Sequence, residues 1–123
     1  MSKQTESGGK SLGSKTLEDW RREIDLLDTE LLRLLSQRAR IACELGAIKV
    51  ASGLPAYDGR RERQVLARMC AENQGPLGQE SVTSIFRCII RETRRIGTKS
   101  MQEQSSKNEI KLQHLAGAPT DMD

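Results

Sequence analysis

Arg38 and Lys49 are the residues whose type and spacing most directly suggest chemistry. In a helix their eleven-residue separation is almost three full turns, so both side chains face nearly the same way, about 16 Å apart. Two long cationic side chains at that spacing could bend toward one small dianion. Packing of the aliphatic stem with a solvated guanidinium is the ordinary alternative for an arginine among apolar residues. The spacing alone leaves both interpretations open.

Arg21 lies on the same helical stripe as Lys49, although the two are 28 residues apart. That separation is roughly 42 Å along a straight helix, so the two cannot contact one small ligand within a chain. If two copies of the helix pair antiparallel about Leu35, Arg21 of one copy lies opposite Lys49 of the other. The spacing therefore predicts two equivalent composite sites in a symmetric dimer.

Further polar residues stand at informative positions in the next two predicted helices. Asp58, Arg61 and Glu62 cluster near the start of one, and Glu62 lies on its apolar stripe, four residues before Leu66. Thr93 interrupts the apolar stripe of the other. A buried threonine often bonds a backbone carbonyl, so Thr93 alone does not indicate a site.

The sequence lacks the side chains that several common types of site require. His114 is the only histidine and falls in a polar tail, which argues against Cys–His nucleophilic catalysis and histidine-based zinc binding. A basic stripe in the third predicted helix has no interleaved aromatic residues for base stacking, so we interpret it as a solvated face. It comprises Arg87, Arg91, Arg94 and Arg95. We expect no metal, no cofactor and no nucleic-acid partner.

One long helix must position the three candidate cations. Thr16 is a candidate N-cap, with Asp19 as an acidic partner in the first turn. From Leu17 onward, a step of three or four residues selects ten positions, which we call the seam. Nine of the ten are apolar, and this pattern predicts a helix of some 35 residues that ends near Ser52 and Gly53. The ten seam positions are Leu17, Trp20, Ile24, Leu27, Leu31, Leu34, Arg38, Ile41, Leu45 and Ile48.

The rest of the chain predicts two shorter helices and no strands, hence an all-α fold of three helices. The second helix begins after Asp58 as N-cap and runs to about Asn73, and Gly75-Pro76 separates it from the third. Residues 1–16 are polar and glycine-rich, which predicts a disordered leader. We expect the helical domain to span residues 17–103 and residues 104–123 to form a flexible tail.

Composition favours a helical oligomer. Of the 123 residues 36% are hydrophobic and only 2% aromatic, and the net charge is +3. A helix of 35 residues is about 50 Å long, longer than a compact domain of this size is wide, so its seam needs a second copy.

The three cysteines show no CxxC spacing, which predicts reduced thiols and a cytoplasmic protein. No apolar run is long enough to cross a membrane, and residues 1–16 contain no secretory signal.

From Leu17 to Gly97 the sequence resembles the all-helical class of chorismate mutases. The resemblance is carried by LEDWRREIDLLDTELLRLLSQRARIACELGAIKV, GLPAYDGRRERQVLARM and GPLGQESVTSIFRCIIRETRR. It implies an intertwined homodimer of three-helix chains that rearranges chorismate to prephenate in phenylalanine and tyrosine biosynthesis, without a cofactor. Each active site would be built mainly by one chain, with one arginine from the other.

The resemblance also implies a role for each matching residue. Arg21 corresponds to the arginine that the partner chain donates. Arg38 and Arg61 correspond to the same-chain pair that binds substrate carboxylates, and Lys49 to the cation that bonds the ether oxygen and a carboxylate. Asp58 and Glu62 resemble the acids at the ring hydroxyl, and Thr93 stands where the family often has serine.

Gly97 departs from the family pattern. Four residues after Thr93 the family usually carries Gln or Glu, whose side chain bonds the ether oxygen. We expect the third helix to continue through Gly97, and a Gly97→Gln substitution to raise kcat/KM by about ten-fold or more, because it restores a donor at the developing charge. The alternative is that the helix bends or ends there and Thr98, Lys99 or Gln102 substitutes.

Two other functions fit the same resemblance. An isochorismate pyruvate lyase has a similar fold and acts on a similar dianion. A catalytically weak dimerisation or regulatory module descended from a mutase would explain Gly97. The resemblance also leaves open activation by a partner enzyme such as a DAHP synthase.

Overall fold

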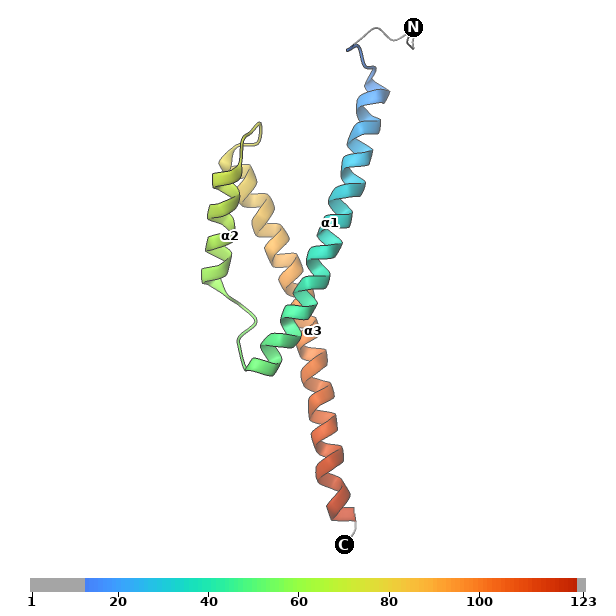
Figure 1. Cartoon of the computed structure of the whole chain (residues 1–123), viewed down its shortest axis with the longest axis vertical. Helices are drawn as coiled ribbons and strands as arrows, with labels where there is room; N and C mark the ends of the chain where they lie inside the picture. The colour runs from blue at the N-terminus through green and yellow to red at the C-terminus, as the bar shows by residue number, and fades with distance from the viewer. Residues whose placement is uncertain (1–12, 122–123) are drawn as a thin grey trace. The chain divides into compact units, whose positions relative to one another are not determined.

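The computed structural model describes residues 13–121, with side chains for residues 13–115. This range consists of three helices, α1 (Leu17–Ser52), α2 (Gly59–Glu72) and α3 (Gln79–Asp121), and contains no strand (Figure 1). The predicted all-α fold with a long first helix is confirmed. Residues 13–34 form one compact unit and residues 35–121 a second. Most of the predicted leader, residues 1–12, lies outside the described residues.

The start of α1 is fixed by the predicted cap. Thr16 Oγ1 accepts a hydrogen bond from the Asp19 amide at 3.1 Å, and Asp19 Oδ2 accepts one from the Thr16 amide at 2.9 Å. These reciprocal bonds satisfy two amides that would otherwise lack partners at the helix start. At the other end Gly53 has a φ of +68°, and the Leu54 amide donates to the Lys49 carbonyl at 2.8 Å. A glycine takes this left-handed conformation at little cost and ends the helix.

The turn between α2 and α3 is organised by Asn73, the residue at which the sequence predicts the end of the second helix. Asn73 Nδ2 donates to the Leu77 carbonyl at 2.8 Å and to Gln79 Oε1 at 3.0 Å. Asn73 Oδ1 accepts from the Gly75 amide at 3.0 Å. This turn lays α2 beside the first half of α3 (Figure 1), where Val65 and Val82 are buried.

Two glycines bring the last part of α1 against α3. A Cβ on Gly46 would lie 2.5 Å from the Gly97 carbonyl oxygen, and a Cβ on Gly97 would lie 2.8 Å from the Ala42 carbonyl oxygen. Both distances are shorter than side chains tolerate. The two helices therefore approach backbone to backbone, and this approach sets the width of the space between them.

The third helix is longer than the sequence predicts. The sequence predicts a helical domain that ends at residue 103 and a flexible tail after it, whereas α3 continues to Asp121. The segment from Met101 to Leu115 contains no glycine or proline and is rich in Gln, Glu, Lys and Leu, which are good helix formers. Local propensity thus supports a helix although the segment shows no periodic apolar face. The flexibility of residues 104–123 stays a prediction.

Little apolar surface is buried in the chain by itself. Among the described residues Val65 and Val82 are the buried hydrophobic side chains, whereas the apolar seam positions of α1 are exposed, from 47% at Leu34 to 64% at Leu17. Cys43, Cys70 and Cys88 are free thiols. No helix in the described range is long and apolar enough to cross a membrane.

Candidate active site

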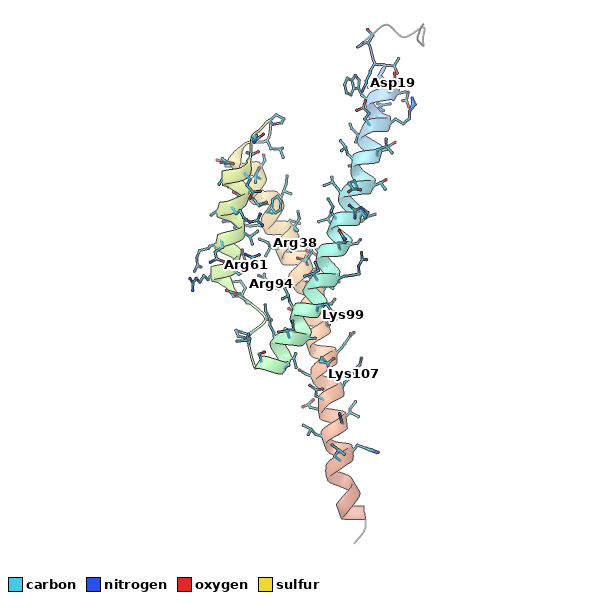
Figure 2. The ribbon with its side chains drawn as sticks, in the orientation of Figure 1. Asp19, Arg38, Arg61, Arg94, Lys99 and Lys107 are labelled. Carbon is cyan, nitrogen blue, oxygen red and sulfur yellow. The ribbon has the colours of Figure 1, made fainter. Side chains whose placement is uncertain are left out.

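A cavity of about 280 Å³ that opens to solvent lies in the second unit, lined by the end of α1, by α2 with the connection before it, and by the middle of α3. Seven of the eight predicted site residues line it. They are Arg38, Lys49, Asp58, Arg61, Glu62, Thr93 and Gly97. Figure 2 labels Arg38, Arg61 and Arg94, which reach this region from α1, α2 and α3 respectively. The structure thus brings together residues that are up to 59 positions apart in the sequence.

Arg38 is held by a hydroxyl rather than by an acid. Its Nη1 donates to Thr93 Oγ1, and that hydroxyl in turn donates to the Ile89 carbonyl at 2.7 Å. Thr93 is 6% exposed, so its bond to the backbone fixes the oxygen that Arg38 meets. Burial, and secondarily the positive charge of Arg61, lowers the pKa of Arg38. The cavity therefore carries positive charge that the fold only partly compensates.

Lys49 and Arg61 complete the cationic wall. Lys49 Nζ donates to the Ala56 carbonyl at 3.0 Å, a contact with the connection between α1 and α2. In the described part of the chain neither of them, nor Arg38, lies within ion-pair distance of a carboxylate. Three cationic side chains without acidic partners around one cavity are suited to an anion with more than one negative charge.

The two acids of the cavity already have partners within the chain. Asp58 is the N-cap of α2, because its Oδ1 accepts from the Arg61 amide at 3.0 Å. This confirms the predicted cap and gives Asp58 a structural role beside any role toward a ligand. Glu62 Oε1 lies 3.2 Å from Arg94 Nη1, and these two side chains are 23% and 34% exposed. The acids therefore neutralise little of the charge on Arg38 and Lys49.

Arg21 is the predicted site residue that does not line the cavity. It lies in the first unit, where its Nη1 pairs with Glu18 Oε1 at 3.1 Å, and its side chain is 62% exposed. An exposed pair one helical turn apart is worth well under about 1 kcal/mol, so Arg21 can readily exchange this partner for another. Its contribution from a second chain stays a prediction.

Gly97 lines the cavity within an uninterrupted helix, as the first of the two alternatives expects. Its contact with Ala42 gives the missing side chain a steric cause, because any Cβ at this position would press on the backbone of α1. A Gln in place of Gly97 would have to separate the helices before it could reach a ligand. The expected gain in rate from that substitution therefore conflicts with the packing, and a loss is expected instead.

Sequence reasoning missed Arg94. The sequence pattern predicts Arg94 in a solvated basic stripe, yet it lines the cavity, pairs with Glu62 and lies over Tyr57, with its Cζ 4.9 Å from the ring centroid. One signal was present: Arg94 follows Ile90 by four residues, and Ile90 belongs to the apolar face. The close approach of α1 and α3 at Gly97 decides that this edge of the stripe faces the cavity.

The arrangement can bind and orient a small dianion and can stabilise negative charge that develops near Lys49. Among the described residues no group of three His, Cys, Asp or Glu side chains is placed to hold a metal ion. Besides its cations and its two partnered acids, the lining carries the buried Thr93 hydroxyl and apolar side chains such as Ile41, Val65 and Ile90. Such a lining suits a compact ligand with an apolar ring and carboxylates at its edges.

Comparison with known proteins gives one consistent result. Residues 20–98 match the family described as chorismate mutase type II. A bifunctional chorismate mutase/prephenate dehydratase of Aquifex aeolicus is 38% identical over 78 residues, which is 60% of this chain and 22% of that protein. A chorismate mutase of Methanocaldococcus jannaschii is 25% identical over 95 residues, covering 75% of this chain and 94% of that protein.

Solved structures agree with the sequence comparison. The structure of a chorismate mutase from Thermus thermophilus superposes with a TM-score of 0.63 at 38% sequence identity, and covers 64% of this chain and 99% of that one. The bifunctional relatives are much longer, and this chain spans about a fifth of their length. The matched part includes every cavity residue up to Thr98.

Proposed function

This chain belongs to the chorismate mutase type II family, and we propose that it converts chorismate to prephenate in aromatic amino-acid biosynthesis. The observation that carries the proposal is the set of three cations, Arg38, Lys49 and Arg61, around a cavity of about 280 Å³. Chorismate is a small dianion with a ring, two carboxylates and an ether oxygen. Its charges match the uncompensated charges of the cavity, and its ring suits the apolar lining.

The rearrangement requires the protein only to position the substrate and to place positive charge near it. In the rearrangement the ether C–O bond breaks while a C–C bond forms between the enolpyruvyl group and the ring, and no atom leaves the substrate. The reaction requires the enolpyruvyl group to lie over the ring. A protein that binds chorismate in this conformation removes the conformational freedom that the free substrate would have to lose in order to react. In the proposed arrangement Arg38 and Arg61 bind the carboxylates, while Asp58 and Glu62 lie toward the ring hydroxyl.

Lys49 has the electrostatic role in this proposal. Negative charge builds on the ether oxygen as the C–O bond lengthens, and an ammonium group nearby stabilises the transition state more than the ground state. The Ala56 carbonyl, at 3.0 Å from Lys49 Nζ, leaves this group two further protons to donate. One ammonium can therefore bond the ether oxygen and a carboxylate at the same time.

We propose further that the active form is a homodimer in which Arg21 completes the site of the partner chain. Support comes from the exposed apolar seam of α1, since an unpaired stripe of this size would be unusual on a monomer in water. Arg21 is exposed on the same helix. Light scattering at micromolar concentration should give twice the chain mass, and a folded, active monomer would contradict this proposal.

The activity is tested by incubating the purified protein with chorismate and following the loss of its absorbance. Chromatography of the products must show prephenate. Release of salicylate and pyruvate from isochorismate would indicate the lyase instead. Absence of chorismate binding in titration calorimetry would favour a non-catalytic module.

Two further predictions need experiments of their own. Adding a DAHP synthase to the absorbance assay tests activation by that partner. Cell fractionation tests the predicted cytoplasmic location.

A further inference from the structure

Arg94 has two partners that tie three parts of the cavity together. From α3 its guanidinium reaches Glu62 on α2, with Nη1 and Oε1 3.2 Å apart, and covers the ring of Tyr57 in the connection between α1 and α2. The two side chains of the ion pair are only 34% and 23% exposed, so water screens the pair less than it screens the exposed pairs of this chain. A cation 4.9 Å from a ring centroid is attracted by the ring face.

Tyr57 stands between two residues with roles in the cavity. The carbonyl of Ala56 accepts the hydrogen bond from Lys49 Nζ at 3.0 Å, and the carboxylate of Asp58 caps α2. The ring also lies against Gly59, where a Cβ would come within 2.9 Å of Tyr57 Oη. Tyr57 directly follows Ala56, so contacts that hold Tyr57 in place also restrict the backbone that presents the Ala56 carbonyl to Lys49.

We propose that Arg94 is a positioning residue of this cavity. Its guanidinium fixes the carboxylate of Glu62 by the ion pair, and it holds the α1–α2 connection, and through it Lys49, by stacking on Tyr57. Arg94 need not touch the substrate to act in this way. The inference rests on the proposed mutase activity and adds to it a residue that the family resemblance does not assign.

Arg94→Met is the direct test, because methionine fills similar space without charge or stacking. Lys49 and Glu62 keep their own charges but lose their fixed positions, so the loss should fall on kcat, roughly ten-fold, with KM changed less than about three-fold. Arg94→Lys keeps the charge and should recover most of kcat. A residue that served stability alone would change the yield of folded protein and leave kcat unchanged.

Tyr57 supplies a second route to the same test. Tyr57→Phe keeps the ring and should retain wild-type kcat, whereas Tyr57→Leu should lower it several-fold. Because Arg94→Met already removes the contact that Tyr57→Leu removes, the double variant Arg94→Met/Tyr57→Leu should be no slower than Arg94→Met. The matched control is Arg95→Met, the next arginine of α3, which is 69% exposed and pairs with Glu92. It should leave kcat and KM unchanged.

Three kinetic results would overturn the inference while wild-type protein is active: kcat of Arg94→Met within two-fold of wild type, an equal loss in Arg95→Met, or strictly additive losses in the double variant. If the wild type shows no turnover of chorismate, the proposed function fails, and a structural measurement decides the inference. Tyr57 is the single tyrosine of the chain, so its ring resonances are identified in an NMR spectrum without further assignment. They should shift in Arg94→Met and not in Arg95→Met, and unchanged resonances in Arg94→Met would overturn the inference.

Discussion

Single residues of the cavity differ in how completely their charges are matched. Glu62 has a cationic partner and the Asp58 carboxylate has a backbone amide, whereas Arg38 has only the Thr93 hydroxyl among the interactions of the described residues. The lowered pKa of Arg38 means that its charged form is less favourable in the folded chain than in the unfolded chain. Because guanidinium groups titrate far above neutrality, Arg38 stays charged, and an anionic ligand relieves the unfavourable energy.

Substituting Arg38 should therefore separate activity from stability. Arg38→Ala is expected to lower kcat/KM by about 10²-fold or more, because a charged contact to the substrate is lost. The melting temperature should change little, since the variant removes a partly buried cation without breaking an ion pair. Steady-state kinetics and a thermal melt measure the two effects. Arg40→Ala, an exposed arginine two residues on, is the control, and near-wild-type kinetics for Arg38→Ala would contradict the assignment.

Asp58 can be tested for its two roles in one pair of variants. Asp58→Ala removes the N-cap of α2 and should cost about 1 kcal/mol of stability. Asp58→Asn keeps an oxygen that can accept from the Arg61 amide, so its stability should stay near that of the wild type. If Asp58 also meets the substrate, both variants lose activity. Activity lost in Asp58→Ala alone would assign this residue to the cap and remove it from the site.

At the scale of elements, what the sequence predicted well depends on local signals. The start of α1 at Thr16, its end near Gly53, the cap at Asp58 and the turn at Asn73 follow from residues a few positions apart. The position of Arg94 and the packing of Gly97 could not be predicted in this way, because they depend on how closely α1 and α3 approach. No local sequence pattern predicts the distance between these two helices. It is set by the contacts that Gly46 and Ala42 of α1 make with Gly97 of α3.

Gly97 gives the sharpest test of that approach. Gly97→Ala should gain about 1 kcal/mol of helix propensity. It also places a Cβ 2.8 Å from the Ala42 carbonyl oxygen, and overpacking typically costs about 1–3 kcal/mol, so a net loss of stability is expected. Gly97→Gln should lose more and should lower kcat/KM. The control Ser106→Ala, at an exposed position of the same helix, should melt at or above the wild-type temperature. A faster Gly97→Gln variant would show that the helices can separate without harm.

At the scale of the whole molecule, the chain has an apolar seam on α1 and an exposed Arg21 at one end of it. Arg21 and the seam positions that precede Arg38 do not line the cavity of their own chain. A second copy would cover the seam and could supply Arg21 to the cavity. The homodimer and the composite site are one proposal, because the same helix carries the apolar contacts and the donated arginine.

Mixing two inactive chains tests that proposal. Arg21→Ala and Lys49→Ala should each be nearly inactive alone. A heterodimer of the two contains one site with both residues intact, so random mixing should restore about a quarter of wild-type activity. Purification with two different tags isolates the heterodimer, whose activity should be about half that of the wild type. A heterodimer as inactive as its parents would exclude the shared site, and mixing Arg21→Ala with itself is the control.

In the described range only Val65 and Val82 are buried hydrophobic side chains, and this scarcity has a kinetic consequence. If the seam is covered only by another copy, an isolated chain has no stable folded form. Folding and association then become a single bimolecular event. Doubling the concentration of unfolded chains should then halve the refolding half-time. Each ten-fold increase in concentration should add about 1.4 kcal/mol to the apparent stability of the dimer. Newly synthesised chains would depend on meeting one another, so the cellular abundance of this protein would govern how quickly it matures.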